Sequence, residues 1–426
     1  MDTANETIRL CIASPSFFPT YGGAQLRFMR YLPGFRERGL EVHVVTGTPT
    51  AKEVAGTTVQ ADWIARSPGH LFPTEEISGT PVHRIRLPDE KGWRRTIMFN
   101  QTLLRFCRDP ATRPDVLQLV TNLRPRTIPW LMRLRRMRIP TVFAVTMAPT
   151  NTSKKPHKRF LRDANFRRLY NQLDCIITNN SPLRDMVRAF GVTTRIEVIP
   201  NGVDLQRFYP EPDGRDRRLV REALGIPDSD LVICTVGAVL PRKGAHLLLE
   251  AWVRLLPRFP ATHVVLVGPE THLEHPKLGD FRRRLEELAR ASGVPQRVHF
   301  TGVVDNVEAY LRAADLFVLP TEREGLPNSV LEAMAIALPV VITPYIGLSD
   351  DIGVAGRHYL LAQPNGEALA EVMAGLLADP DRRRGLGRAG REWVEETMDL
   401  ERSLDRYVAL YRELALSSSG ARALRP

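Results

Sequence analysis

Cysteine is scarce in this chain: four residues in 426, far apart at Cys11, Cys107, Cys175 and Cys234. Their spacing matches no metal-ligand or redox motif, so they are read as reduced thiols packed in a core. Apolar runs are also short, and none approaches the ~20 residues of a membrane-spanning helix. The first residues are acidic where a secretion signal would be basic. We therefore expect a cytoplasmic protein without a structural metal.

Acidic residues are sparse in the first half of the chain. Residues 1–195 hold 31 Lys and Arg against 15 Asp and Glu, whereas the remainder holds 28 against 33. The excess peaks between residues 133 and 168, where Asp163 is the single acid among eleven basic residues: Arg133, Arg135, Arg136, Arg138, Lys154, Lys155, Lys158, Arg159, Arg162, Arg167 and Arg168. Such a region attracts anionic lipid or phosphate polymers, or is simply a solvated helix face. Few aromatic residues lie there, so we expect no nucleic acid partner.

The order of apolar segments indicates the fold class. Short β-branched runs alternate with amphipathic stretches, which predicts α/β domains with parallel sheets. Expected strands are residues 8–13, 42–46, 116–120, 141–145, 175–178 and 195–199, then 231–237, 263–267, 298–301, 315–319 and 339–343. Expected helices are residues 24–38, 245–255, 280–291, 307–313, 329–335 and 403–416. The Gly-, Pro- and Thr-rich segment 49–81 is predicted to be an extended loop.

The length and this alternation predict two doubly wound, Rossmann-like domains that face each other across a cleft. Residues 1–195 form the expected first domain, 196–229 a linker region and 230–400 the second domain. A last helix at 401–416 and a frayed tail at 417–426 follow. Because ligands of parallel sheets bind at the carboxyl ends of strands, functional motifs are expected just after strands.

The first such motif is Gly22-Gly23, between the first strand and the first helix. Paired glycines let the backbone approach a ligand, and the free N–H groups at a helix start attract phosphate. An ordinary turn explains these glycines equally well. The pattern is not G-x-G-x-x-G, and no acidic residue follows at the dinucleotide position, which disfavours a nicotinamide-dependent enzyme.

The second motif is Arg242-Lys243, in the loop between the expected strand 231–237 and helix 245–255. Two cations beside a helix N-terminus oppose the helix dipole. Their presence makes better sense if an anion lies between them and the helix, since arginine and lysine both bind phosphate well.

The third motif is a pair of carboxylates eight residues apart, Glu324 and Glu332, beside the turn Gly325-Leu326-Pro327-Asn328. Carboxylates accept hydrogen bonds from sugar hydroxyls, and the helix start between them suits a diphosphate. Glu332 has a second interpretation, because Ser329 and Glu332 fit a capping box that serves only the helix.

Taken in order, these motifs resemble the family-4 glycosyltransferases, retaining enzymes of the GT-B fold that use nucleotide-activated sugars. The resemblance rests on PSFFPTYGGAQLRF, VIPNGVDLQRF (198–208), VGAVLPRKGAHLLLEAW (236–252), VHFTGVVDNVEAYLRAADLFVLPTEREGLPNSVLEAMAIALPVV and ALAEVMAGLLADPDRRRGLGRAGREWV. It is dense from about residue 196 to 395 and thin over residues 40–190.

The resemblance implies a role for each motif. Arg242 and Lys243 hold the donor diphosphate and neutralise it as a leaving group, while Glu324 contacts the donor sugar and Glu332 the ribose. The backbone amide of Gly23, beside Gly22, approaches the diphosphate, and the amides of Gly325 and Leu326 approach the sugar and phosphate. Pro327 and Asn328 complete that substrate-binding turn. The leaving phosphate itself helps to deprotonate the acceptor, so the resemblance implies no nucleophile, metal or cofactor. The last helix, at 401–416, resembles the family's C-terminal segment, which implies that it crosses back to the first domain.

Some positions depart from the family pattern. Many relatives carry a histidine near the reacting sugar at the end of the strand expected at 141–145, where this chain has Thr146-Met147. Either Thr146 substitutes in part or the histidine is dispensable. Relatives often have glycine at Ala337, and the acidic turn after the next strand is altered at 346–351. Asp228-Ser229-Asp230 matches a metal-binding D-x-D pattern but precedes a strand, so we expect a turn there.

The sequence thus predicts a cytoplasmic glycosyltransferase that moves a sugar from a nucleoside-diphosphate sugar to a hydroxyl acceptor. Residues 133–168 leave open a peripheral contact with the inner membrane face and a lipid or glycan acceptor, and a soluble acceptor stays open too. The alternative is a non-catalytic protein that binds anionic lipid or nucleic acid and carries a vestigial GT-B domain.

Overall fold

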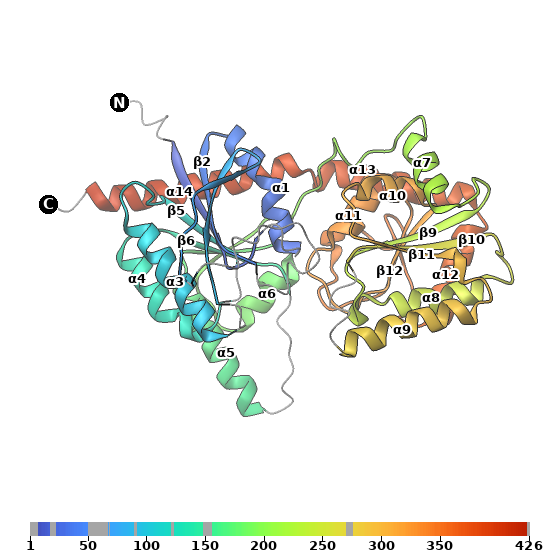
Figure 1. The fold of residues 1–426 in the computed structure, drawn as a ribbon, viewed down its shortest axis with the longest axis horizontal. Coiled ribbons are helices and arrows are strands. Elements are labelled where there is room, and N and C mark those ends of the chain that lie inside the picture. Colours follow the sequence, from blue (N-terminus) through green and yellow to red (C-terminus); the bar gives the residue numbers. More distant parts are fainter. Residues whose placement is uncertain are drawn as a thin grey trace. The chain divides into compact units, whose positions relative to one another are not determined.

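The computed structural model describes residues 7–17, 23–49, 67, 69–88, 92–120, 123–147, 156–269 and 276–423. The chain forms two compact units. In Figure 1 the first is coloured from blue to green together with the red C-terminal helix, and the second from green to orange. Unit 1 contains the residues up to Ile199 together with those from Glu401 onward, and unit 2 contains Pro200–Leu400. Each unit is a sheet with helices on both faces, as the alternation of strands and helices predicts.

The sheet of unit 1 is parallel except at one edge. Its order is β3 (Glu75–Ile77), β4 (Thr80–Ile85), β2 (Leu40–Gly47), β1 (Ile8–Ser14), β5 (Val116–Leu119), β6 (Thr141–Val145), β7 (Cys175–Thr178) and β8 (Arg195–Val198), with β3 antiparallel to β4. One face is covered by helices that share a single core cluster with the sheet: α3 (Trp93–Arg108), α4 (Ile128–Arg136), α5 (Pro156–Tyr170) and α6 (Ser181–Ala189). The turn η1 (Pro125–Thr127) leads into α4.

A second apolar surface of unit 1 joins its first helix to the last helix of the chain. The ring of Tyr407 in α14 (Leu400–Ala423) packs against three aromatic rings of α1 (Gly23–Glu37), with centroids 5.6–6.3 Å apart: Phe28, Tyr31 and Phe35. The Tyr411 hydroxyl donates to Oε1 of Gln118 in β5 at 2.8 Å. The C-terminal helix is therefore a structural part of unit 1.

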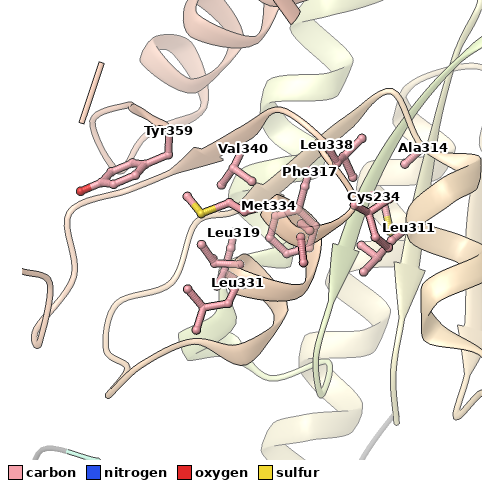
Figure 2. Packing of buried hydrophobic residues seen from close by; sticks show 14 of the residues in the cluster. Cys234, Leu311, Ala314, Phe317, Leu319, Leu331, Met334, Leu338, Val340 and Tyr359 are labelled. Carbon is pink, nitrogen blue, oxygen red and sulfur yellow. The ribbon is translucent and has the colours of Figure 1, made fainter. Parts of the chain in front are cut away.

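The sheet of unit 2 is wholly parallel among its described strands. Its order is β11 (Val298–Gly302), β10 (Thr262–Val267), β9 (Leu231–Val236), β12 (Leu316–Leu319), β13 (Val340–Ile342) and β14 (Leu360–Leu361). One face packs against α8 (Ala245–Leu255), α9 (Pro276–Ala291) and α12 (Gly366–Leu377). The other packs against α10 (Val307–Ala313), α11 (Asn328–Ala335) and α13 (Pro380–Thr397). Figure 2 shows that second core, where Phe317 and Leu319 of β12 lie beside Leu331 and Met334 of α11.

An aspartate directly precedes each of the strands β5, β7 and β12. Its carboxylate accepts a hydrogen bond from one of the first backbone amides of the adjacent strand, β1, β6 or β9. The accepting atom is Oδ2, at 2.8–2.9 Å, in the pairs Asp115–Arg9, Asp174–Thr141 and Asp315–Val232. The expected strand 315–319 therefore begins at Leu316, because Asp315 turns its side chain to this hydrogen bond.

Three segment expectations differ from the structure. Residues 50–66 and 68 of the predicted loop 49–81 lie outside the described residues. The remainder contains β3 and runs into β4, a hairpin whose short, charged edge strand carries little apolar signal. Part of the expected linker 196–229 is α7 (Arg215–Leu224), which belongs to unit 2 and packs with α10. The expected tail begins inside α14, which continues to Ala423 because no proline interrupts SSSGARA. Six further helices of the described part have no counterpart among the expected ones: α3, α4, α5, α6, α12 and α13.

Candidate functional site

The sheet of unit 2 reverses its strand order between β9 and β12. The chain runs from β9 to β10 and β11 on one side, and from β12 to β13 and β14 on the other. Ligands of doubly wound sheets bind where the loops after two such strands separate. A pocket lies there, at the carboxyl ends of β9, β10 and β12, and it is lined by Thr235, Val236, Gly237, Ala238, Val239, Lys243, Ala245, Leu266, Val267 and Leu319.

The loop after β9 brings two cations to this pocket. It passes through the turn η2 (Pro241–Lys243) to Gly244 and then enters α8. Gly244 has φ +74°, and a Cβ on it would overlap the carbonyl oxygen of Pro320 at the end of β12. Glycine is therefore required here, both for the left-handed backbone and for the close approach of the two loops.

The loop after β12 supplies a carboxylate between these cations. Oε1 of Glu324 accepts from Nη1 of Arg242 at 2.9 Å and from Nζ of Lys243 at 2.7 Å. The Thr321 hydroxyl donates to the same oxygen at 3.1 Å. The Glu324 side chain is only 9% exposed, so two cations and a hydroxyl compensate for the loss of its hydration.

Backbone hydrogen bonds fix the position of this carboxylate. The carbonyl of Arg242 accepts from the amide of Glu322 at 2.9 Å, and that of Ile346 accepts from the amide of Glu324 at 3.2 Å. Gly347, at φ +107°, lies so close to the Glu324 carbonyl that a Cβ would overlap it. The loop is thus held by the neighbouring loops after β9 and β13.

The turn that follows leads directly into α11. Gly325, Leu326 and Pro327 are buried, and Asn328 is the first residue of the helix. The N-cap is Pro327, without a side-chain cap hydrogen bond. The capping-box interpretation of Ser329 and Glu332 is therefore wrong, because Ser329 already lies inside the helix. Glu332 is 5% exposed in the first turns of α11.

The remaining residues that the sequence analysis named lie in unit 1, in unit 2 away from its pocket, or outside the described part. Gly22 lies outside the described residues, and Gly23 is the first residue of α1. Thr146 directly follows β6 and is half-buried. Asp230 of the D-x-D pattern precedes β9, and its Oδ2 lies 3.1 Å from Nε2 of His263, so this pattern is at the opposite end of the strands from the pocket.

The described part of the chain contains no group of three or more His, Cys, Asp or Glu that could hold a metal ion. Within the same residues, no helix is both long and apolar enough to cross a bilayer.

The basic region 133–168 is only partly described. Arg133, Arg135 and Arg136 are exposed on α4, and none of them forms an ion pair within the described residues. Arg162 pairs with Asp163 at 2.7 Å. Lys154 and Lys155 lie outside the described residues, as do the side chains of Lys158 and Arg159.

Sequence reasoning missed two residues that contact the site. Thr321 bonds Glu324, and Nδ2 of Asn201 donates to the Leu326 carbonyl at 3.3 Å and to Oδ1 of Asn328 at 2.5 Å. Thr321 lies two residues after the end of β12, in the region where the strand-end rule places ligand-binding residues. Asn201 lies in the segment 198–208, which carries the resemblance but no chemical signal of its own.

Two family models match this chain in succession. Residues 21–207 match Glycosyltransferase Family 4, and residues 216–393 match Glycosyl transferases group 1. The chain therefore belongs to the group 1 glycosyltransferases of the family-4 type, as the sequence motifs predict, and its two doubly wound units confirm the GT-B fold class.

Curated relatives are similar over about half of the chain. A GDP-mannose-dependent alpha-(1-6)-phosphatidylinositol monomannoside mannosyltransferase of Mycolicibacterium smegmatis is 32% identical over 54% of this chain and 59% of its own length. A D-inositol 3-phosphate glycosyltransferase of Geodermatophilus obscurus is 32% identical over 59% of this chain and 55% of its own length. The similarity thus spans little more than half the length of these relatives.

Solved structures resemble nearly the whole chain. Sucrose-phosphate synthase from Thermosynechococcus elongatus gives a TM-score of 0.73 at 21% identity and covers 96% of this chain and 100% of its own. Anabaena HepE in complex with UDP and glucose gives 0.70 at 18% identity, covering 95% and 99%. At these identities the likeness shows the fold.

Proposed function

We propose that this protein is a retaining glycosyltransferase that moves a sugar from a nucleoside-diphosphate sugar to a hydroxyl acceptor. The observation that carries the proposal is the cluster of Arg242, Lys243 and Glu324 beside the pocket at the strand-order reversal of unit 2. Two cations and a helix start favour an anion, and the adjacent carboxylate accepts hydrogen bonds from hydroxyls. Family membership supports the same chemistry.

Each group has a role in the proposed reaction. Arg242 and Lys243 bind the diphosphate and neutralise the charge that develops on it as the bond to the sugar breaks. Glu324 accepts from the sugar hydroxyls, and Glu332 accepts from the ribose. Amides of Gly325 and Leu326 face the sugar and phosphate, and Gly23 and Thr146 would act from unit 1.

The proposed displacement retains the configuration of the sugar. The acceptor oxygen attacks from the side on which the diphosphate leaves, and an oxygen of the leaving phosphate takes the acceptor proton. Because the two cations neutralise the diphosphate, the proposed reaction needs neither a metal ion nor another cofactor.

GDP-mannose is the first donor to test, because the mycobacterial relative is named as GDP-mannose-dependent. The acceptors named for the relatives carry inositol, either phosphorylated or in a phospholipid. We propose an anionic polyol of this class as acceptor. The exposed arginines of α4 support a peripheral contact with the anionic cytoplasmic face of a membrane.

Thermal-shift measurements with GDP, UDP and ADP, and with their sugar conjugates, test the donor site. We expect one nucleoside diphosphate to raise the melting temperature, since a ligand that binds only the folded state stabilises it. Lys243→Ala should abolish the shift. Arg254→Ala, which removes an exposed cation from the last turn of α8, should keep it. No shift with any nucleotide would contradict the proposal and favour the non-catalytic alternative.

Liposome sedimentation tests the membrane contact. Reversing the charges of Arg133, Arg135 and Arg136 to glutamate should weaken binding to vesicles that contain phosphatidylinositol at low salt. The same reversal at Arg258, Arg382 and Arg388, exposed residues of unit 2, provides the control for net charge. Equal binding by both triple variants would refute a contact through α4.

A further inference from the structure

Asn201 is a buried residue whose side-chain amide contacts the turn 325–328 of the proposed donor site. It is the second residue of unit 2 and is 6% exposed. Its Nδ2 donates to the carbonyl of Leu326 at 3.3 Å and to Oδ1 of Asn328 at 2.5 Å. The nitrogen must face the turn, because the Leu326 carbonyl can only accept.

The turn that Asn201 contacts has no cap of its own. Pro327 lies between the two bonded residues, carries no N–H and provides no side-chain cap for α11. Its carbonyl accepts from the amides of Val330 and Leu331 in the first helical turn. The Leu326 carbonyl lies before the helix, and the Asn201 amide provides its hydrogen bond.

The chain on either side of Asn201 is anchored. The amide of Val203 donates to the Met398 carbonyl at 2.7 Å, and the amide of Leu400 donates to the Val203 carbonyl at 3.0 Å. Segments near the two ends of unit 2 are therefore paired, and Asn201, two residues before Val203, extends from a fixed backbone toward the turn.

We propose that Asn201 is a positioning residue of the donor site. By fixing the Leu326 carbonyl and the Asn328 side chain, it orients the peptide units of Gly325 and Leu326. The amides of these two residues face the sugar and phosphate in the proposed function, on which this inference rests. The Arg242 and Ile346 carbonyls fix the first part of the loop through the amides of Glu322 and Glu324. Asn201 fixes its last part through the Leu326 carbonyl. Sites of this kind require supporting groups that hold donors within about 0.5 Å of the productive geometry.

Asn201→Asp and Asn201→Ala test the inference. Aspartate keeps the size but replaces the donor with an acceptor that repels the Leu326 carbonyl. The matched control is Asn365→Ala, which removes the N-cap of α12, where Asn365 Oδ1 accepts from the Ala368 amide at 2.9 Å. This control lowers stability without touching the site.

The first readout is amide hydrogen exchange of a peptide covering residues 321–331. We expect faster exchange there in both Asn201 variants and unchanged exchange in Asn365→Ala. This measurement needs no nucleotide, so it decides the positioning role even if the proposed function fails. Unchanged exchange in the Asn201 variants would overturn the inference.

The second readout is the affinity for the nucleotide sugar that the wild-type protein binds. Misplaced backbone donors should weaken binding by about tenfold or more in Asn201→Asp. Asn365→Ala should bind as the wild type does at a temperature where all variants are folded. If the wild type binds and Asn201→Asp binds equally well, the inference fails while the proposed function stands. If the wild type binds no nucleotide, the proposed function fails.

Discussion

Glu324 pairs with both cations of the proposed donor site. Its Oε1 lies within 2.9 Å of Arg242 Nη1 and 2.7 Å of Lys243 Nζ, where the oxygens of a diphosphate would bind in the proposed reaction. In the proposed reaction, the diphosphate therefore competes with this carboxylate for the cations. A carboxylate released from them would be available to the hydroxyls of the sugar.

Glu324→Gln should therefore affect nucleoside-diphosphate binding and sugar transfer in opposite directions. We expect the variant to bind the nucleoside diphosphate about fivefold more tightly or better, because the competing charge is gone. Transfer should be lost, since the amide is a weaker acceptor for the sugar hydroxyls. Isothermal titration with the diphosphate measures the first effect and product formation the second.

Glu322→Gln is the matched control for this experiment. Glu322 is an exposed carboxylate two residues earlier in the same loop. If both variants bind the diphosphate with the same affinity, the tighter binding reflects net charge and not release of the cation pair.

At the residue scale, the sequence predicted the charged residues of the site but not the residues that hold its loop in place. Arg242, Lys243 and Glu324 follow strands, and the strand-end rule locates such residues without any structure. Asn201 and Leu326 lie 125 positions apart, and no local pattern indicates that they meet. The capping box failed because Pro327 takes the cap position in the folded chain.

Helix α7 is joined to the sheet of unit 2 by a buried arginine. The Arg221 side chain is 1% exposed, and its Nη2 pairs with Oδ2 of Asp315 at 2.7 Å. Its other nitrogens donate to four backbone carbonyls, of Ala313, Pro227, Asp228 and Asp230. Removing only one partner of such a buried ion pair is destabilising, because the other charge stays buried without compensation.

Arg221→Ala should lower the free energy of unfolding by about 3 kcal/mol or more, because Asp315 and the four carbonyls lose a buried partner. Urea denaturation of unit 2 measures the change. Arg217→Ala removes a partly exposed partner of the same aspartate, 3.0 Å from Oδ1, and should cost below about 1 kcal/mol. Equal costs for the two variants would show that burial of Arg221 does not matter.

Paired histidines occupy equivalent strand positions in the two units. His43 Nδ1 lies 3.1 Å from His83 Nε2 on β2 and β4, and His263 Nδ1 lies 3.0 Å from His299 Nε2 on β10 and β11. Each first histidine also contacts a carboxylate, Glu41 or Asp230. Burial, together with the neighbouring histidine, lowers the pKa of His83 and of His299 to about 4.

These pairs should make the fold sensitive to acid. The unfolded imidazole has a pKa of about 6.5, so the unfolded chain binds more protons than the folded chain at intermediate pH. The contribution to stability is complete above about pH 6.5 and is lost as the pH falls toward about 4.

Chemical denaturation between pH 7.5 and 4.5 measures this dependence. Replacing His83 and His299 together by glutamine should flatten the pH profile of the free energy of unfolding. The exposed His70 provides the control, since His70→Gln should leave the slope unchanged. An unaltered slope in the double variant would exclude the histidine pairs as its source.

At the element scale, long periodic segments were predictable and short charged ones were not. Helix α8 has the predicted bounds, Ala245–Leu255, because its apolar positions repeat at helical spacing. Strand β3 has the sequence EEI and pairs only at the edge of the sheet, so its pairing with β4 is a tertiary effect.

At the scale of the whole molecule, the chain leaves unit 1 after Ile199 and rejoins it at Glu401. Unit 2 is continuous in sequence, whereas unit 1 is completed only by the residues from Glu401 onward. The α/β alternation predicted the two domains, and the family resemblance predicted the returning helix. The aromatic contacts between α14 and α1 could not be predicted, because they join residues almost 380 positions apart.

Tyr407→Ala should destabilise unit 1 alone. Removing a ring buried against Phe28, Tyr31 and Phe35 leaves a cavity and should cost about 3–5 kcal/mol. In differential scanning calorimetry we expect the transition of unit 1 to move to lower temperature while that of unit 2 stays in place. Tyr209→Ala, at an exposed position of unit 2, should shift neither transition appreciably. A parallel shift of both transitions after Tyr407→Ala would show that the units unfold as one.

The return of α14 sets an order of events during protein synthesis. All residues of unit 2 emerge from the ribosome before Glu401, so that unit can fold while translation continues. The rings of Phe28, Tyr31 and Phe35 on α1 are made before unit 2, but Tyr407, which covers them, is made only after it. The newly made first unit is therefore the part of this protein with most need of a chaperone, and a ribosome that stops before codon 401 releases it with that aromatic surface exposed.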